Sequence, residues 1–257
     1  MTESLITLEF SEQTAVIWLN RPARHNALVP GLLQDLLSVL ADERSRDANA
    51  VILAAKGRSF STGGDLLGFW EHREDIAAYA HELVGLLNEV VLAIFAHPVP
   101  VAAAVQGQVT GGSLGLLLAT DRVFMTREVS ITPWYLEVGF SPDGGWTALL
   151  PDIIGRQRTS HWLSTNASAT AEECLDMGVA HEIADDVVGA TLDWSRQITG
   201  KSVASIRNTR KLLNSGSAEI GERLEAERMA FVQQVQTREA ITGIARFLGK
   251  DISEEIT

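Results

Sequence analysis

The chain has 257 residues, with 21 Lys or Arg and 33 Asp or Glu, which gives a formal net charge of −12. A chain of this length can bury a substantial hydrophobic core without a disulfide or a structural metal. The charge argues against nucleic acid as a partner, because a polyanion is repelled unless the surface carries a basic stripe. Cys174 is the single cysteine, which excludes a disulfide framework within the chain and favours a reducing compartment.

The two ends and the apolar stretches give no sign of export or membrane insertion. The N-terminal residues MTESLITLEF lack the basic start and apolar run of a signal peptide, and the terminal SEEIT matches no peroxisomal or retention signal. The longest apolar stretches, residues 90–96 and 99–105, are separated by His97 and Pro98 and are shorter than the ~20 residues that span a bilayer. We therefore expect a cytoplasmic protein without a membrane segment.

The N-terminal part of the sequence predicts strands and a helix. Residues 5–10 and 15–20 are predicted to pair as a β-hairpin, and Pro30 suits the first turn of a helix. Ala50–Ala55 is a short apolar run that ends at a Lys-Gly pair, which favours a buried strand followed by a loop. The buried stripe of the helix is predicted to consist of Leu32, Leu33, Leu36, Leu37 and Leu40.

A repeated order of strand, glycine turn and helix follows. Residues 74–96 predict a long helix, and residues 99–105 predict another buried strand. The segment 107–121 turns through glycines into a short apolar helix, and the same order recurs over residues 122–150. This alternation is typical of an α/β protein.

Beyond residue 200 the pattern changes to helices alone. They cover residues 203–214, 218–235 and 238–248. We predict an α/β core over residues 1–200 and a helical region over residues 201–257. Apolar stripes on these helices need a partner surface, which predicts a homo-oligomer. The residues of these stripes are Leu212, Leu213, Ile241, Ile244, Phe247 and Leu248.

Two glycine-rich segments, about fifty residues apart, carry the main chemical signal. They read GRSFSTGGDL from Gly57 and GQVTGGSLG from Gly107. The second segment also matches the G-x-S-x-G turn of serine hydrolases, with Asp143 and His161 or His181 downstream in the required order. The chain lacks the HGGG-type segment that completes such a site, so this interpretation is the weaker one.

The histidines do not predict a metal site. All six are scattered along the chain, and no H-E-x-x-H motif or paired Cys/His spacing occurs among them. They are His25, His72, His81, His97, His161 and His181. We therefore expect no metal.

Six segments in chain order together resemble the crotonase superfamily, which includes enoyl-CoA hydratases and isomerases. They are NRPARHNAL from Asn20, FSTGGDL from Phe60, the Gly-Gly segment that ends in Asp121, PDGGWTALLP from Pro142, AEECLDMGVA from Ala171 and GIARFLGK from Gly243. The resemblance extends over nearly the whole chain. It implies a spiral of repeated ββα units with C-terminal helices that form a trimer or a dimer of trimers.

The resemblance also implies an acyl-CoA substrate and an oxyanion hole made by the N–H groups of Gly64 and Gly112. Fixed N–H dipoles are well suited to the negative charge that develops on a thioester oxygen, and one such donor is typically worth ~10²- to 10³-fold in rate. Coenzyme A enters as part of the substrate, so no separate cofactor is expected. The CoA contacts that the resemblance implies are Arg24, His25, Ala27, Thr62 and Leu66, with Lys250 as a contact to phosphate.

The reaction depends on the acidic residues. At the two positions where hydratases of the family have glutamates, this chain has Gly115 and Tyr135, so ordinary hydration lacks its acid and base. Asp143 instead matches the single carboxylate of the enoyl-CoA isomerases, which shift a 3-enoyl double bond to the 2-enoyl position. An apolar pocket would raise the pKa of this aspartate and make it a better base. That pocket is predicted to include Trp134, Tyr135, Phe140 and Trp146.

Four alternatives to an isomerase stay open at this point. Asp143 also resembles the nucleophile of chlorobenzoyl-CoA dehalogenase, but the supporting histidine and tryptophan of that enzyme are replaced by Asn88 and Tyr135. A thioester hydrolase could use Asp143 as a base or nucleophile. The remaining two are a hydratase-like enzyme and a relative that binds acyl-CoA without catalysis.

Overall fold

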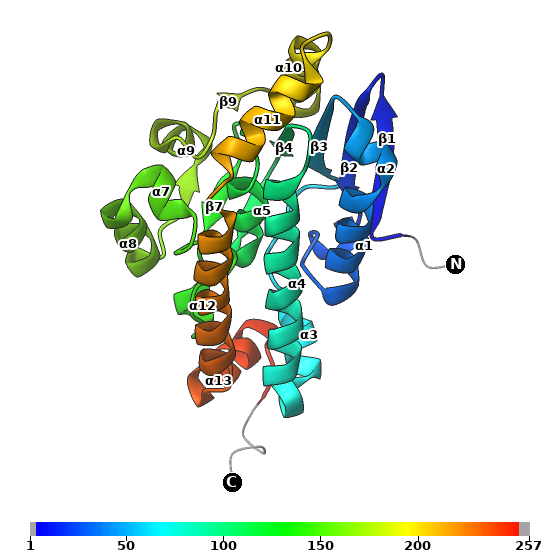
Figure 1. Cartoon of the computed structure of the whole chain (residues 1–257). Helices are drawn as coiled ribbons and strands as arrows, with labels where there is room; N and C mark the ends of the chain where they lie inside the picture. The colour runs from blue at the N-terminus through cyan, green and yellow to red at the C-terminus, as the bar shows by residue number, and fades with distance from the viewer. Residues whose placement is uncertain (1–3, 252–257) are drawn as a thin grey trace.

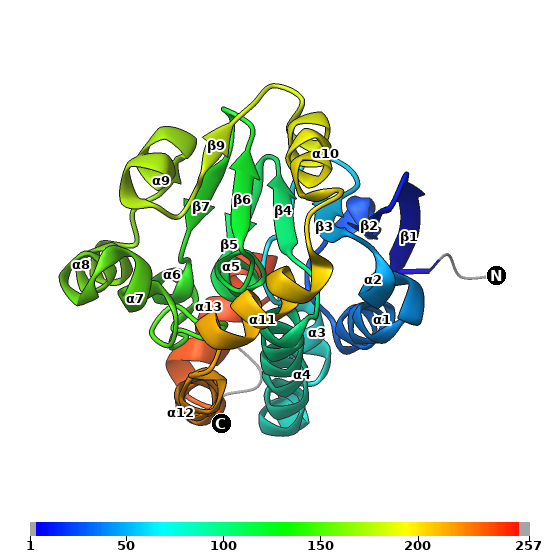
Figure 2. The same cartoon turned by 45° about the horizontal axis from the view of Figure 1, so that its top comes forward.

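The structure is a computed structural model that describes residues 4–251. The first three residues of the N-terminal stretch and the terminal SEEIT lie outside the described residues. The chain forms two β-sheets surrounded by helices (Figures 1 and 2), which confirms the predicted α/β class.

The larger sheet has six strands in the order β1-β2-β3-β4-β6-β9. Only the β1/β2 pair is antiparallel, which confirms the predicted hairpin, and the other pairs are parallel. The strands are β1 (Ile6–Ser11), β2 (Thr14–Leu19), β3 (Ala50–Ala55), β4 (Val101–Val105), β6 (Arg122–Met125) and β9 (Glu182–Ile183). Strand β4 begins two residues later than predicted, because Pro98 and Pro100 have no N–H for the ladder.

The smaller sheet has the order β5-β7-β8. Its strands are β5 (Gln108–Thr110), β7 (Ser130–Thr132) and β8 (Ala169–Thr170). The chain runs from β4 in the larger sheet to β5 in the smaller one and then into a helix, and it repeats this order with β6 and β7. This is the repeated ββα unit predicted from the sequence.

Thirteen α-helices occur in the described residues. The first six are α1 (Pro30–Ala41), α2 (Glu43–Asp47), α3 (Leu66–Glu71), α4 (Ile76–Ala96), α5 (Leu114–Leu118) and α6 (Tyr135–Val138). Four more, in a part of the chain without predicted elements, are α7 (Leu150–Ile154), α8 (Arg156–Thr165), α9 (Ala171–Met177) and α10 (Val187–Ile198). The last three, which confirm the predicted helices, are α11 (Val203–Leu213), α12 (Ser217–Val235) and α13 (Arg238–Leu248).

Both faces of the larger sheet are buried. Alternate side chains such as Val51 and Val101 face the main core, and their neighbours Ile52 and Ala102 pack on the other face against α10. Because successive side chains of a strand point to opposite faces, a sheet covered on both sides needs continuous apolar runs. This explains why the strands read as unbroken apolar segments in the sequence.

Helix α4 packs between α1 and α12 (Figure 1). Together with the preceding turn, residues Arg73–Ala96 are long and apolar enough to cross a membrane by length and composition, and half of the most apolar window is buried within the protein. A buried core helix meets the same criterion. The contacts of α4 with two neighbouring helices agree with that explanation.

The C-terminal helices are joined to the core. Arg210 of α11 is buried, and its guanidinium donates to the carbonyl oxygens of Ile94 and His97 and forms an ion pair with Asp121. A cation at the C-terminal end of α4 is favoured by the helix dipole. Leu224 of α12 belongs to the same hydrophobic cluster as α4, so the division between residues 200 and 201 stays a prediction.

The apolar stripes of these helices are used differently from what we predicted. Ile244 is buried in the core of this chain, and Phe247 and Leu248 line the pocket described below. For Ile244 the prediction of a partner surface was wrong, because α13 packs on α3 and α6, whereas Phe247 keeps 58% of its surface exposed. Leu212 and Leu213 remain 75% and 76% exposed.

Candidate active site

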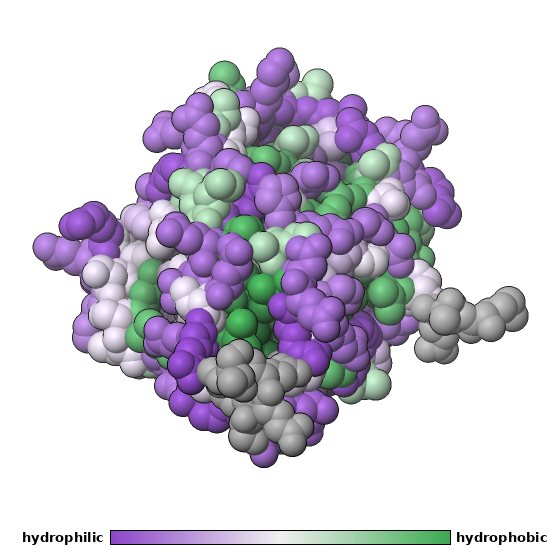
Figure 3. Space-filling model, turned by 90° about the horizontal axis from the view of Figure 1, so that it is seen from below, coloured by the Kyte–Doolittle hydropathy of each residue, from purple (hydrophilic) through white to green (hydrophobic). Residues whose placement is uncertain are grey.

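A pocket of about 490 Å³ lies where the two sheets meet the C-terminal helices. It is lined by residues 23–27, 62–69, 108–112 and 133–143 and by side chains of the helices α4, α12 and α13. Seen from below the view of Figure 1, hydrophobic residues gather in a recess surrounded by hydrophilic ones (Figure 3). That end of the molecule carries α3 and α13, which contribute Phe69 and Phe247 to the pocket.

The two glycine-rich segments lie side by side and are hydrogen-bonded. Ser61 accepts a bond of 3.1 Å from the N–H of Thr110, and its own N–H donates to the carbonyl of Gln108 at 3.2 Å. Gly63 has a φ of +71°, and a Cβ at this position would lie 2.7 Å from the carbonyl oxygen of Thr110. Only glycine permits this approach, so the backbone fixes the spacing of the two segments.

The N–H groups of Gly64 and Gly112 are free to bind a ligand. Gly64 forms a parallel bridge with Leu28 in which the flanking residues Gly63 and Asp65 make the hydrogen bonds, so its own N–H points away from Leu28. In residues 4–251, no backbone hydrogen bond outside the helices and strands uses the N–H of Gly64 or Gly112. Both glycines line the pocket, which is the arrangement needed for an oxyanion hole.

Ser113 does not act as the nucleophile of a serine hydrolase in this structure. Its side chain is fully buried, and its hydroxyl donates to the carbonyl oxygens of Thr110 and Ser61 at 2.7 and 3.1 Å. The hydroxyl therefore joins the two glycine-rich segments. This accounts for the serine within the G-x-S-x-G pattern.

Asp143 is buried at the inner end of the pocket. Burial raises the pKa of its carboxyl to about 7, the hydrogen bond from Tyr135 opposes this rise, and the negative charge of Glu227 adds to it. In residues 4–251 no ion pair involves Asp143. A carboxylate with a pKa near neutrality and no cation beside it is suited to act as a general base.

The carboxylate of Asp143 lies against the second oxyanion glycine. Both of its oxygens are 2.8 Å from the position that a Cβ of residue 112 would occupy. A side chain at residue 112 would therefore displace this carboxylate, so glycine is required here for the close approach. Asp143 and Gly112 therefore line the same part of the pocket.

Tyr135 holds Asp143 in place. Its hydroxyl lies 2.7 Å from Oδ1 and 3.0 Å from the main-chain oxygen of Asp143. Burial, together with the nearby Asp143, raises the pKa of Tyr135 well above its usual value, so the phenol stays protonated and donates. Within residues 4–251, no other residue donates a hydrogen bond to Oδ2.

The structure also explains why the paired glutamates of the hydratases are absent. A Cβ on Gly115 would lie 2.2 Å from the carbonyl oxygen of Gly144, so no side chain fits at the first position. The second position holds Tyr135. The turn that carries Asp143 therefore occupies the space that the first glutamate would need.

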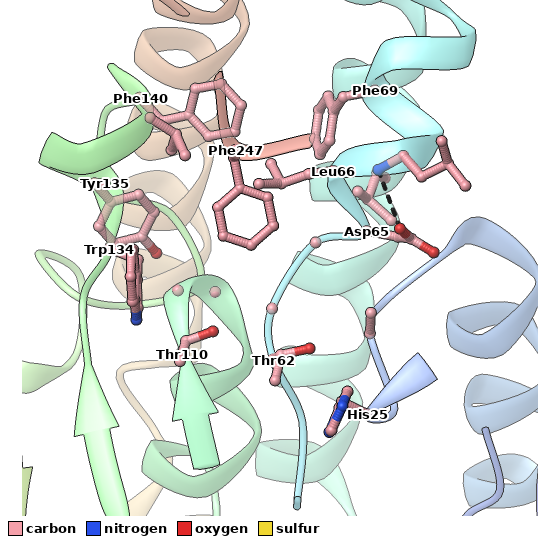
Figure 4. Close-up of a pocket in the computed structure, with 18 of the residues that line it drawn as sticks. His25, Thr62, Asp65, Leu66, Phe69, Thr110, Trp134, Tyr135, Phe140 and Phe247 are labelled. Carbon is pink, nitrogen blue, oxygen red and sulfur yellow. Dashed lines mark hydrogen bonds between the residues drawn. The ribbon is translucent and has the colours of Figure 1, made fainter. Parts of the chain in front are cut away.

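The predicted CoA contacts that line the pocket are Arg24, His25, Ala27, Thr62 and Leu66. In Figure 4, His25 and Thr62 lie at one end, away from the aromatic rings of Phe69 and Phe140. Lys250, the predicted phosphate contact, is exposed but does not line the pocket. Its role stays a prediction.

Asp65 links the oxyanion hole to the basic residues. Its carboxylate forms ion pairs of 2.8 Å with Arg21 and 3.0 Å with Arg24, and it accepts a hydrogen bond of 3.1 Å from the N–H of Leu67. Burial opposes ionisation, but these two arginines lower the pKa of Asp65 overall. The residue next to Gly64 is thereby fixed, a role that the sequence analysis did not predict.

The aromatic residues divide into two groups. Trp134, Tyr135 and Phe140 line the pocket as predicted. Trp146 does not line it, because its indole is fully buried behind Tyr135 and its Nε1–H donates to the carbonyl of Gly111 at 2.8 Å. It therefore supports the wall of the pocket from behind.

Further apolar side chains in the pocket were not predicted as site residues. They are Phe69, Leu83, Val138, Phe231, Phe247 and Leu248. Phe247 projects between Trp134 and Leu66 in Figure 4 and meets the ring of Trp134 edge-on, with 6.3 Å between centroids. These residues come from distant parts of the chain, so only the fold brings them together. The end of the pocket away from His25 and Thr62 is largely aromatic.

Comparison with known proteins agrees with this geometry. The family model for enoyl-CoA hydratase/isomerase matches residues 9–253. The chain belongs to this family. The predicted crotonase-type fold is confirmed by the structure of enoyl-CoA hydratase from Bacillus halodurans, which is 26% identical and superimposes with a TM-score of 0.88 over 95% of this chain and 100% of that chain.

Relatives within the family have different activities. A 4-chlorobenzoyl coenzyme A dehalogenase from Arthrobacter is 30% identical over 69% of this chain and 65% of that protein, so the match spans less than two thirds of its length. The mitochondrial Δ(3,5)-Δ(2,4)-dienoyl-CoA isomerase of Rattus norvegicus is 24% identical over 99% of this chain and 82% of that protein. Sequence identity to these relatives therefore does not decide which reaction this chain catalyses.

Proposed function

We propose that this enzyme is an enoyl-CoA isomerase that converts a 3-enoyl-CoA into the conjugated 2-enoyl-CoA. The observation that carries the proposal is a single buried carboxylate, Asp143, placed against Gly112 in an apolar pocket. A double-bond shift needs one base, because the proton that leaves one carbon is returned to another. Hydration would need a second group to position water.

The reaction begins when the N–H groups of Gly64 and Gly112 bind the thioester oxygen. Asp143 Oδ2 removes a proton from C2, and the electrons of that C–H bond form a dienolate whose negative charge is held by the two N–H groups. The same carboxylic acid then gives its proton to C4. The double bond moves from C3–C4 to C2–C3, Asp143 is again ionised, and no cofactor is consumed.

The electrostatics of Asp143 suit this role. An aspartate with its ordinary pKa is a weak base, whereas a pKa of about 7 brings the carboxylate close to the range in which general bases are most effective at neutral pH. Tyr135 donates to Oδ1 and leaves Oδ2 for the proton. The apolar walls formed by Phe69 and Phe140 keep water from the dienolate.

The CoA moiety of the substrate is proposed to lie along Arg24, His25 and Thr62, with Lys250 near its phosphates. No separate cofactor or metal is part of the proposal. We further propose a trimer or a dimer of trimers in the cytoplasm. The exposed Leu212 and Leu213 support an association surface on α11.

A dehalogenase or thioester hydrolase that uses Asp143 is the second candidate. The similarity to the Arthrobacter dehalogenase and the aromatic walls of the pocket favour it. Asn88, which replaces the supporting histidine, is buried outside the pocket lining and donates to the carbonyl of Leu224 at 3.0 Å. It cannot assist an attack on an aromatic ring, so the isomerase is the better supported function.

The proposal is tested with a panel of 3-enoyl, 2-enoyl and aromatic acyl-CoAs, including 4-chlorobenzoyl-CoA. The isomerase produces a conjugated thioester of unchanged mass, detected by its ultraviolet absorbance. Free CoA would indicate hydrolysis, and the replacement of chloride by hydroxide would indicate dehalogenation. Either of these products without any double-bond shift contradicts the isomerase.

A further inference from the structure

A second buried carboxylate holds the loop that follows Asp143. Glu227 lies on α12 and is 4% exposed. Its Oε2 accepts a hydrogen bond of 2.7 Å from the N–H of Gly145, and its Oε1 accepts bonds of 2.6 and 2.9 Å from the N–H groups of Thr147 and Ala148. The hydroxyl of Thr147 donates another bond of 2.7 Å to Oε1.

These contacts match an ionised carboxylate. Burial raises the pKa of Glu227 overall, although the hydrogen bonds from Gly145, Thr147 and Ala148 oppose that rise. The three backbone N–H groups can only donate, and both carboxylate oxygens receive at least one of them. A protonated oxygen would face a donor, so the geometry favours the negative charge.

The same loop is held from its other side by the oxyanion hole. Gly144 and Gly145 have φ values of +62° and +92°, and a Cβ on Gly144 would lie 2.3 Å from the carbonyl oxygen of Gly112. The turn is therefore held between Gly112 and Glu227. A shift of this turn would move Asp143 relative to the N–H of Gly112.

The charges around the two carboxylates are not balanced locally. Asp143 accepts a hydrogen bond from the hydroxyl of Tyr135 on α6, and the carboxylate of Glu227 on α12, bound two residues further on at Gly145, raises the pKa of Asp143. In residues 4–251, neither Asp143 nor Glu227 has an ion-pair partner. The arginines of α12 are paired elsewhere, Arg223 with Asp152 and Arg228 with Glu225. A like charge disfavours ionisation of its neighbour.

We propose that Glu227 is a positioning residue that holds Asp143 against the oxyanion hole and, through its uncompensated charge, keeps Asp143 basic. This inference rests on the proposed function only in taking Asp143 as the base. A positioning role of this kind differs from a purely structural one, because removing the charge of Glu227 should change the pKa of Asp143 as well as the rate.

The test compares Glu227→Gln with the parent and with Glu225→Gln, an exposed glutamate on the same helix. A displaced base typically costs up to about 10²-fold in rate, so kcat should fall toward that value in Glu227→Gln and stay within a few fold in Glu225→Gln. The acid limb of the pH profile should move to lower pH in Glu227→Gln alone, since the like charge has been removed. An unmoved acid limb overturns the proposal.

Carbon-13 NMR of labelled aspartate and glutamate carboxyls gives a readout that needs no activity. The pKa of Asp143 should fall in Glu227→Gln and remain near the parent value in Glu227→Asp, which keeps the charge. If Glu227→Gln does not fold, the coupling is measured from the other partner, because Asp143→Asn should lower the pKa of Glu227. If the pKa of Asp143 is the same in the parent and in Glu227→Gln, or the pKa of Glu227 is the same in the parent and in Asp143→Asn, the inference is overturned. Absence of isomerase activity alone contradicts only the proposed function.

Discussion

The hydroxyl of Tyr135 donates a hydrogen bond of 2.7 Å to Oδ1 of Asp143, although Tyr135 occupies a position where related hydratases have a glutamate. A second carboxylate at residue 135 would repel Asp143 in this buried site, whereas a phenol stabilises its ionised form. The tyrosine therefore leaves Asp143 as the single carboxylate at this end of the proposed site. This relationship leads to the first prediction.

Tyr135→Phe should move the acid limb of the activity profile to higher pH. The hydrogen bond from Tyr135 lowers the pKa of Asp143, so its removal raises that pKa further above 7. The shift is opposite to that expected for Glu227→Gln. The measurement is kcat/KM between pH 5 and 9 for both variants, and shifts of the same sign would contradict the assignment.

The parent enzyme should lose activity as the pH falls through about 7. Asp143 is the base only when ionised, and its pKa in the folded protein is raised to about 7, so it is protonated at pH 5 and largely ionised at pH 8. Binding of a nonreactive acyl-CoA, measured by calorimetry, serves as the control for CoA affinity. An acid limb near pH 4 would show that Asp143 has an ordinary pKa or is not the base.

Lys250→Glu should weaken acetyl-CoA binding, because it places a carboxylate near the phosphates of CoA. The loss should decrease at high salt, which screens exposed charges. Lys201→Glu is the matched control, since Lys201 is also exposed and lies before α11. Equal affinity and equal salt dependence in the parent and Lys250→Glu would remove Lys250 from the CoA site.

Light scattering should give a mass of at least about three times the 27.9 kDa of one chain. Replacing Leu212 and Leu213 together with Asp should reduce this mass, because both side chains are exposed and apolar on α11. The matched control is Leu175→Asp, at an exposed leucine of α9. A parent protein that is monomeric at micromolar concentration would contradict the prediction.

Local sequence signals predicted much of the fold and part of the site. These signals are proline at residue 30, the apolar run at residues 50–55 and the glycine segments. Each predicted the local structure at its own position, and the corresponding elements were found. Ile244, which is buried within its own chain, was assigned to a partner surface because an apolar stripe on a helix does not reveal which surface covers it. Only the fold shows that α13 covers the pocket.

Glu227 illustrates a stronger limit on what can be predicted from the sequence. It lies in the charged segment LEAER of α12, where glutamate is typical of a solvated helix face. Its four hydrogen bonds reach residues about eighty positions earlier in the chain. No spacing rule connects such distant segments, so the partner of a buried carboxylate could not be predicted from the sequence.

The central claim is tested most directly by Asp143→Asn, assayed with a 3-enoyl-CoA that the parent isomerises. Asparagine keeps the size and polarity of the side chain but removes the basic oxygen, so kcat should fall by roughly 10²- to 10⁴-fold. The dissociation constant of a nonreactive acyl-CoA should stay within a few fold, since the CoA contacts lie elsewhere in the pocket. Isomerase activity within a few fold of the parent would contradict the account.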